Sequence, residues 1–224
     1  MRSNWPARKL QLTSLALVIA VAASILYGWW QVDGPGASSR TSKVSNLPLS
    51  ITQMNFSLID HKGNQVQPVD WIGTPLLVFF GFTYCPDICP TTLADITGWL
   101  EALDEDTERV NVSFITVDPE RDTSEAMAAY VENFHPAIVG YTGSPQDIDD
   151  VAAGFKVRFE KIVTGQTYTM DHTAGVFVYD AEGRFVSIID FHEPRENAVP
   201  KIRRAIELSA QADFGSDQGF TRTK

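Results

Sequence analysis

A run of 19 uncharged residues, from Leu12 to Trp30, limits what this chain can fold into more than any other feature. At about 1.5 Å of rise per helical residue, this run approaches the roughly 30 Å hydrocarbon core of a bilayer. The residues before it are basic and not acidic, with positive charges at Arg2, Arg8 and Lys9. The positive-inside rule then keeps residues 1–11 in the cytoplasm and exports everything after the run. The sequence therefore predicts a single transmembrane anchor over residues 12–30.

A cleaved signal peptide is the competing interpretation of this segment. The apolar part of a signal peptide is about 7–15 residues long and ends at a small-x-small cleavage site, whereas Tyr27-Gly28-Trp29-Trp30 is a poor site of that kind. A mitochondrial presequence needs an Arg- and Ser-rich amphipathic segment ahead of the run, and nine residues leave no room for one. We therefore expect an uncleaved anchor in a bacterial inner membrane, with the soluble part in the periplasm.

The charge of the exported part excludes nucleic acid as a partner. Of the 18 basic residues three precede the anchor, so 15 basic and 28 acidic residues remain, a net charge of −13. A field of this sign opposes binding to nucleic acids and to anionic lipid surfaces. Residues 31–46 are rich in Gly, Ser and Pro and predict a flexible tether, residues 47–211 have the length of one domain, and residues 212–224 resemble a loose tail.

The hydrophobic pattern of residues 47–211 predicts an α/β fold. An N-terminal hairpin is expected where Phe56–Ile59 and the segment from Val66 flank a Gly-containing turn, and Pro75–Phe80 is a continuous apolar run typical of a strand buried on both faces. The further expected strands are 110–117, 138–141, 176–179 and 185–191, and the expected helices are 91–103, 122–134, 144–155 and 197–211. Strands that alternate with helices favour a sheet covered on both faces, in a thioredoxin-like arrangement.

The two cysteines of the chain, Cys85 and Cys89, follow the first buried strand in a C-x-x-x-C spacing. Residues four apart meet on one helix face, and the N-terminus of a helix favours a thiolate over a thiol. Two soft sulfur ligands favour Cu(I) or Zn, although structural Zn sites use four Cys or His ligands. A structural disulfide is the alternative, but a bridge around three residues stabilises a fold little.

A third ligand has to come from outside the cysteine pair. Of the four histidines, His61 and His135 lie in a predicted turn and at a helix end, which suggests solvated loop positions, and His192 is ambiguous. His172 directly precedes a predicted buried strand, in a loop that faces the cysteine helix in thioredoxin-like folds. From the pattern alone, His172 is a candidate ligand and a structural role stays open.

Four segments of the exported part resemble the Sco/SenC copper chaperones of cytochrome oxidase assembly. These segments are GFTYCPDICPTTL at 81–93, TVDPERDTSEAMAAYV at 116–131, VGYTGSPQDI at 139–148 and MDHTAGVFVYDAEGRF at 170–185. The resemblance implies a thioredoxin-like domain on one N-terminal span, with copper held by Cys85, Cys89 and His172. Two thiolates and one imidazole suit Cu(I), and an added oxygen ligand would suit Cu(II). Asp118 is expected near the site, as a ligand-orienting residue, as an oxygen ligand or as a turn former before Pro119, whereas Met170 is expected to pack.

Two function classes follow from this resemblance. In the first, the protein is not an enzyme but a metallochaperone that receives copper from a periplasmic donor and passes it to the CuA centre of oxidase subunit II. In the second, it is a thiol–disulfide reductase that keeps the cysteines of that centre reduced and uses Cys85 and Cys89 as a redox disulfide pair. The three intervening residues favour the first class, since dedicated oxidoreductases use C-x-x-C. A peroxidase is a weaker hypothesis, because no activating Arg is identifiable.

Overall fold

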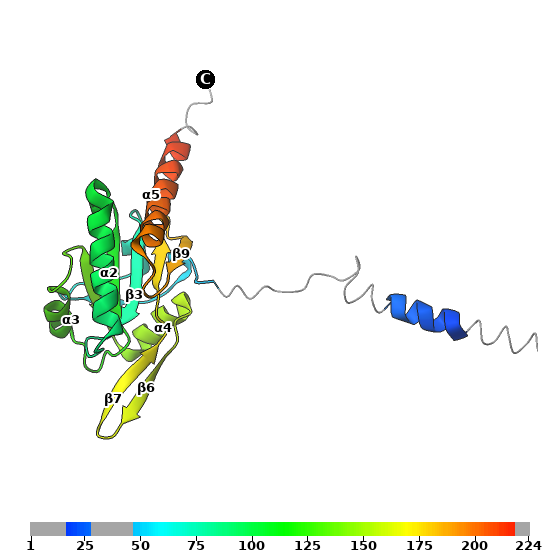
Figure 1. Cartoon of the computed structure of the whole chain (residues 1–224), viewed down its shortest axis with the longest axis horizontal. Helices are drawn as coiled ribbons and strands as arrows, with labels where there is room; N and C mark the ends of the chain where they lie inside the picture. The colour runs from blue at the N-terminus through cyan, green and yellow to red at the C-terminus, as the bar shows by residue number, and fades with distance from the viewer. Residues whose placement is uncertain (1–16, 28–46, 218–224) are drawn as a thin grey trace, which may run out of the picture. The chain divides into compact units, whose positions relative to one another are not determined.

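The computed structural model describes residues 17–27 and 47–217, in two compact units whose mutual placement is not defined. In the first unit, residues 17–27 form a helix with exposed apolar side chains (Figure 1). No helix within the described ranges combines the length and the apolar character that a membrane crossing needs. Both ends of the anchor predicted over 12–30, the predicted tether 31–46 and the tail beyond residue 217 lie outside the described residues, so these remain predictions.

The second unit is built on a seven-stranded sheet with the order β2-β1-β5-β4-β3-β8-β9 (Figure 1). Its centre is parallel, because β4 pairs with both β3 and β5, whereas the pairs β1–β2, β1–β5, β3–β8 and β8–β9 are antiparallel. The strands are β1 (Leu58–Asp60), β2 (Gln65–Val66), β3 (Leu76–Gly81), β4 (Asn111–Thr116), β5 (Ile138–Thr142), β8 (Val176–Tyr179) and β9 (Phe185–Ile189). The predicted α/β fold with an added N-terminal hairpin is confirmed.

Helices cover both faces of this sheet, as the apolar run of β3 requires. The helices are α2 (Ile88–Leu103), α3 (Ser124–Val131), α4 (Pro145–Phe155) and α5 (Arg195–Asp217), and short 3-10 turns lie at Ile51–Gln53, Pro68–Trp71 and Asp104–Arg109. Phe80 of β3 meets Phe155 of α4 at 5.3 Å between ring centroids, on one face. On the other face Phe79 stacks on Phe114, which in turn contacts Tyr130 of α3. Helices α2 and α5 pack side by side in front of β3 (Figure 1).

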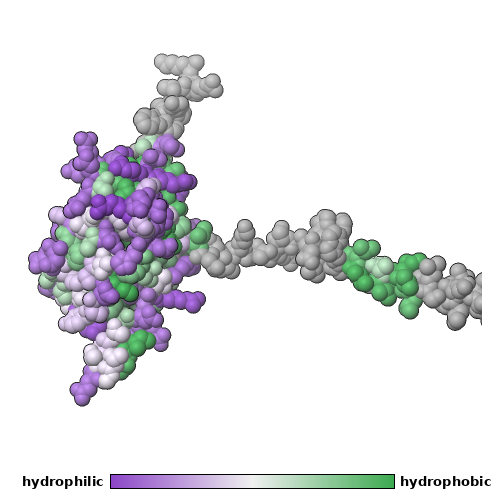
Figure 2. Space-filling view, viewed as in Figure 1, coloured by the Kyte–Doolittle hydropathy of each residue, from purple (hydrophilic) through white to green (hydrophobic). Residues whose placement is uncertain are grey.

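A second sheet of only two strands was not anticipated from the sequence. Strands β6 (Phe159–Thr164) and β7 (Thr167–His172) form an antiparallel hairpin that projects from the body of the domain (Figure 1). Its residues are mostly exposed, including the apolar Ile162 and Val163, and hydrophobic surface is visible along it in Figure 2. His172 is therefore the last residue of a strand and not a loop residue.

Several helix boundaries differ from the sequence prediction, and three of them are informative. Helix α2 begins at Ile88, before Cys89, and not after it. Helix α3 is capped by Thr123, whose hydroxyl accepts from the Ala126 amide, because the side chain of Asp122 is committed elsewhere. Helix α5 continues to Asp217, beyond the predicted end at 211. By contrast, Ser144 caps α4 as its Ser-Pro start predicts.

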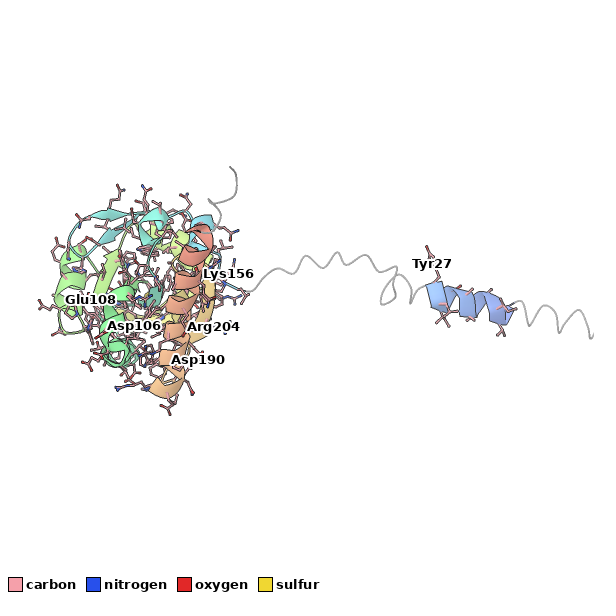
Figure 3. The ribbon with its side chains drawn as sticks, turned by 90° about the horizontal axis from the view of Figure 1, so that it is seen from above. Tyr27, Asp106, Glu108, Lys156, Asp190 and Arg204 are labelled. Atoms are coloured by element: carbon pink, nitrogen blue, oxygen red, sulfur yellow. The ribbon has the colours of Figure 1, made fainter. Side chains whose placement is uncertain are left out.

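Charged side chains lie around the periphery of the second unit (Figure 3). Glu108, Lys156, Asp190 and Arg204 are exposed, and Asp106 is half-buried in ion pairs with Arg109 and Arg203. Surface pairs of this kind stabilise a fold by at most about 1 kcal/mol. The stability of the domain therefore comes from its core, in which β3 is buried along its whole length.

Candidate metal centre

The first half of the site is the junction between β3 and α2. Cys85 lies just before α2 and is half-buried. Cys89 is the second residue of α2 and has no exposed surface. The Cys89 amide donates to Cys85 Sγ at 3.4 Å. The Cys85 sulfur thus accepts from one of the free N–H groups of the first turn, where Asp87, the residue before the helix, makes no side-chain cap. The two cysteines approach through this cap and not, as the spacing suggested, as two residues on one helix face.

Cys89 Sγ packs directly on the last residue of β3. A Cβ at Gly81 would lie 2.8 Å from Cys89 Sγ and 2.9 Å from Cε2 of Phe114. Contacts this short are not tolerated, so only glycine lets the sulfur sit here. Burial raises the pKa of the Cys89 thiol, helped by the nearby Cys85 and opposed by a hydrogen bond from the Phe82 backbone. The expectation that the helix N-terminus favours a thiolate is therefore wrong for Cys89, because desolvation outweighs it.

The second half of the site is His172 at the end of β7. Its Nδ1 lies 3.0 Å from the carbonyl oxygen of Thr173, and only a protonated nitrogen can donate to that acceptor. Nε2 therefore carries the lone pair, and it lies 3.8 Å from Cys89 Sγ. Burial lowers the pKa of His172, and the hydrogen bond to Thr173 opposes this shift only in part. The imidazole is therefore neutral near pH 7. A neutral imidazole is the form that binds metals.

The sulfur–nitrogen separation fits two donors of one metal ion. With metal–sulfur and metal–nitrogen bonds of about 2.0–2.3 Å, two ligands of the same ion lie up to about 4.4 Å apart. Both cysteines are reduced. However, no group of three or more His, Cys, Asp or Glu residues within 17–27 and 47–217 is arranged to hold a metal ion. The structure thus brings Cys89 and His172 together and places Cys85 beside them without completing a three-donor cluster.

A buried carboxylate fixes the loop that precedes the cysteines. Asp122 accepts from the Thr83 amide at 3.0 Å, from the Thr83 hydroxyl at 2.6 Å and from the Thr116 hydroxyl at 2.6 Å. Burial raises the pKa of Asp122, and these hydrogen bonds oppose that rise. The sequence pattern indicates only a helix-start role for Asp122, and its support of the cysteine loop is not predicted.

Asp118, expected near the site, is buried and faces the hairpin instead of the cysteines. Its carboxylate accepts from Arg121 Nε and, at 2.9 Å, from the hydroxyl of Tyr168 in β7. Arg121 also donates to the Tyr168 carbonyl at 3.1 Å. Both Asp118 oxygens are thus engaged, which disfavours direct metal ligation and favours an orienting role.

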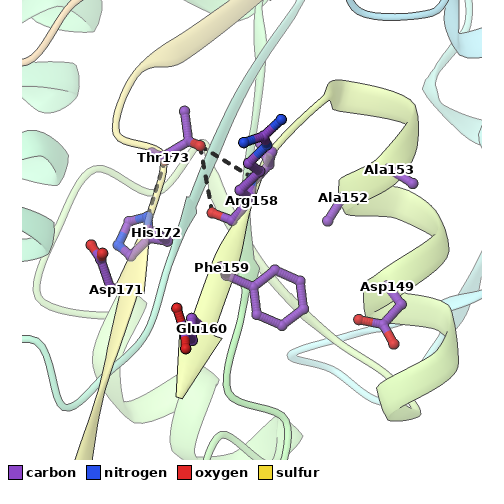
Figure 4. A pocket seen from close by; sticks show the side chains of 10 residues that line it. Asp149, Ala152, Ala153, Arg158, Phe159, Glu160, Asp171, His172 and Thr173 are labelled. Carbon is purple, nitrogen blue, oxygen red and sulfur yellow. Dashed lines mark hydrogen bonds between the residues drawn. The ribbon is translucent and has the colours of Figure 1, made fainter. Parts of the chain in front are cut away.

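An open pocket of about 740 Å³ lies against His172 (Figure 4). Arg158 and Thr173 close its rim, since the Arg158 amide and carbonyl both bond to the Thr173 hydroxyl, at 3.1 and 3.4 Å. The charged residues of the lining are mostly acidic, with Asp149, Glu160 and Asp171 against the single Arg158, and most of the other lining side chains are apolar. The imidazole therefore borders an open pocket whose charge is net negative.

The other histidines lie outside the site, and two of them are structural instead of solvated. His61 Nδ1 accepts from the Gly140 amide at 3.0 Å and His135 Nδ1 accepts from the Ala137 amide at 3.1 Å. His192 is exposed and pairs with Asp95 at 3.6 Å. Met170 is buried in the core, as expected for a packing residue.

The fold and the site together define a thioredoxin-like domain in which a cysteine pair at a strand–helix junction faces a histidine on an added hairpin. A family model described as SCO1/SenC matches residues 45–207. The chain belongs to this family.

Sequence relatives support the assignment to the SCO1/SenC family. The mitochondrial SCO2 homologue of Danio rerio is 34% identical over 191 residues, which cover 83% of this chain and 67% of that protein. Protein sco1 of Schizosaccharomyces pombe is 35% identical over 190 residues, which cover 81% and 72%. The similarity to these two relatives thus extends over most of the chain.

Solved structures extend the similarity to three dimensions. Bradyrhizobium japonicum ScoI with copper bound is 39% identical, with a TM-score of 0.65 over 70% of this chain and 99% of that one. Yeast Sco1 with copper bound is 30% identical, with a TM-score of 0.64 over 71% and 89%. A third structure, BsSco, is described as a member of the Sco family of cytochrome c oxidase assembly proteins, and at 22% identity and a TM-score of 0.59 it supports the fold.

Proposed function

We propose that this protein is a copper carrier that binds one copper ion through Cys85, Cys89 and His172 and assists assembly of cytochrome c oxidase. One observation carries the proposal: the lone pair of His172 Nε2 lies 3.8 Å from the sulfur of Cys89, on a tautomer fixed by Thr173. Related Sco structures with copper bound support copper as the cargo. Soft sulfur ligands with one imidazole favour Cu(I) over harder divalent ions.

In this proposal copper joins Cys85 to the donor pair formed by Cys89 and His172. Cys85 Sγ accepts the Cys89 amide, and a metal-bound thiolate can keep such an N–H···S hydrogen bond. The buried Cys89 thiol has a raised pKa, and coordination would replace its proton with the metal. Uptake therefore releases protons and is expected to weaken as the pH falls.

The receiving partner in this proposal is the CuA domain of oxidase subunit II. His172 borders an open pocket and Cys85 is half-buried, which supports handover of the metal to a partner domain. The apolar N-terminal run and the basic residues before it support a single-pass anchor, with the domain on the periplasmic side of a bacterial inner membrane. Protease accessibility in spheroplasts tests this placement, and protection of the domain would contradict it.

The alternative is a thiol–disulfide reductase for the CuA cysteines. Two free cysteines in close contact, one of them accessible, support this alternative. A redox mechanism needs both sulfurs but has no evident use for the His172 imidazole.

The variant His172→Ala separates the two functions. A carrier loses one of three donors, so copper retention and cellular oxidase activity at limiting copper should both fall, while thiol exchange with a subunit II domain persists. Met170→Leu is the matched control, because it alters a neighbouring buried side chain on β7 that only packs. Normal oxidase activity of His172→Ala despite weak copper binding, without copper supplementation, would refute the carrier function.

A further inference from the structure

Arg121 contacts three chain segments around the metal centre. Its guanidinium lies 4.6 Å from the ring centroid of Tyr84, the residue before Cys85, and 3.9 Å from that of Tyr168 in β7. The same group pairs with Asp118 of the loop after β4. One side chain thus joins the cysteine loop, the loop after β4 and the strand that ends in His172.

The contacts of Arg121 connect the backbone of β7 to the loop after β4. Nε binds Asp118 Oδ2, whereas Nη1 donates to the backbone carbonyl of Tyr168 at 3.1 Å. Nη2 is buried and has no hydrogen-bond partner in the described part of the chain, and the aromatic rings flank the guanidinium. A planar guanidinium makes such fork and stacking contacts simultaneously, which an ammonium group cannot do.

The hairpin needs a support of this kind because it is not part of the main sheet. Among the described strands β6 and β7 pair only with each other, and a two-stranded hairpin is at best marginally stable alone. The ion pair between Lys161 and Glu120 also reaches back to the domain, but it is largely exposed and stabilises weakly. Tyr168, by contrast, is held through its ring, its hydroxyl and its carbonyl.

We propose that Arg121 is a positioning residue that holds β7, and therefore His172 Nε2, against the cysteine junction. This proposal rests on the copper function proposed above, but its effect on the hairpin is independent of the metal. Loss of the guanidinium removes the contacts that tie β7 to Asp118 and Tyr84, while both cysteine sulfurs remain available as donors. Copper affinity then falls because the third donor is no longer held in place.

Arg121→Lys tests the proposal in the full chain, because lysine keeps the charge beside Asp118 and loses the fork and the stacking. We expect Cu(I) affinity, measured by competition with a chromophoric chelator, to fall about 10- to 100-fold, the usual cost of removing a group that orients a ligand. In a His172→Ala background the same substitution should change affinity less than about twofold, since nothing is left to position. An equal loss in both backgrounds would overturn the proposal.

Arg184→Lys is the matched control for general destabilisation. Arg184 pairs with the buried Asp180 at 2.7 Å, in the turn between β8 and β9 and away from the cysteines. We expect its copper affinity to equal that of the wild type. Tyr168→Leu supplies a second test that leaves the Arg121–Asp118 pair in place, and it should reproduce the effect of Arg121→Lys.

Hydrogen exchange in the metal-free protein decides the positioning role even if His172 proves not to bind copper. Arg121→Lys should speed exchange of the β6 and β7 amides at least about tenfold while the amides of β3 and β4 stay as slow as before. Unchanged exchange in the hairpin would overturn the proposal. A faster hairpin together with unchanged copper affinity in His172→Ala would instead contradict the ligand assignment of the proposed function.

Discussion

The two halves of the metal centre differ in how firmly the fold holds them. Cys89 sits in the core, with no exposed surface, and its sulfur packs against Gly81. His172 ends a hairpin in which β6 is largely exposed and which pairs with no strand of the main sheet. One donor is therefore fixed by the packing of the whole domain, and the other by the buried Met170 of β7 and a few polar and aromatic contacts.

This difference suits a protein that has to release what it binds. Local opening requires least free energy where few buried contacts have to be broken, which here is the hairpin. A metal held by a rigid sulfur and a movable imidazole can lose one donor without unfolding of the domain. We therefore expect the histidine side to open first during transfer, while the sulfur side keeps the ion.

The largest effect is expected for substitutions of Cys85 and Cys89, which form the rigid half of the metal centre. Cys89→Ser and Cys85→Ser each leave one sulfur and one imidazole, a poor donor set for Cu(I), so the bound copper per chain should fall from one to near zero. The loss should exceed that of Arg121→Lys. Metal analysis after gel filtration checks it, with circular dichroism as the control for folding. Oxidation of both cysteines to a disulfide should block binding equally, and copper uptake by the oxidised chain at full affinity would contradict the assignment.

Gly81→Ala should damage the rigid half through packing alone. The new methyl group would overlap Cys89 Sγ and Phe114, and overpacking of this kind lowers the free energy of unfolding by about 1–3 kcal/mol. Copper affinity should fall with it, because the sulfur is displaced. Urea denaturation measures the first effect.

Gly98→Ala, in helix α2, is the control for the glycine substitution. Its methyl group would meet only Arg195 Nη2, the end of a flexible side chain, at 3.0 Å. Alanine is the better helix former by about 1 kcal/mol, so stability should hold or rise. Equal stabilities of both variants and the wild type would show that Gly81 does not set the position of the sulfur.

The smallest expected effect is on the pH dependence of stability, through the buried carboxylate of Asp122. The folded-state pKa of Asp122 is raised above 3.8, so the folded protein binds this proton more tightly than the unfolded chain does. Its contribution to stability is full below pH 3.8 and is lost as the pH rises through the folded-state pKa. Asp122→Asn has no such proton, and its amide can donate to the Thr83 hydroxyl in place of accepting from it.

Subtracting the pH profiles of the two proteins isolates this contribution. We expect the free energy of unfolding of Asp122→Asn to improve relative to the wild type as the pH rises from about 4 towards neutrality. Chemical denaturation at stepped pH values measures it. Parallel profiles would mean that the buried carboxylate does not titrate as its surroundings imply.

Local patterns predicted part of the fold around the cysteines. The apolar run of β3 and the Ser-Pro start of α4 each have a cause within a few residues, and the structure has both. The cysteine spacing wrongly suggested two residues on one helix face. The role of Asp122 could not be seen in this way, because its partner Thr83 lies 39 residues earlier in the chain. The requirement for glycine at position 81 is likewise visible only when Cys89 and Phe114 are in place.

The other half of the metal centre, the β6–β7 hairpin that carries His172, was predicted poorly for a different reason. Strand β6 is exposed along nearly its whole length, so no alternation of apolar and polar residues marks it in the sequence. The D-P-E-R-D segment contains the useful signal, since Asp118, Arg121 and Asp122 all lie in it and all support the site. The resemblance drew attention to Asp118 alone, whereas the contacts of Arg121 appear only in three dimensions.

The central claim is that one copper ion is bound by two sulfurs from the rigid half and by the imidazole of the hairpin. X-ray absorption at the copper edge, on the full chain loaded with one equivalent of Cu(I), tests it most directly. We expect two sulfur ligands and one nitrogen ligand in the wild type, and loss of the nitrogen alone in His172→Ala. A ligand set that lacks sulfur, or one that His172→Ala leaves unchanged, would contradict it.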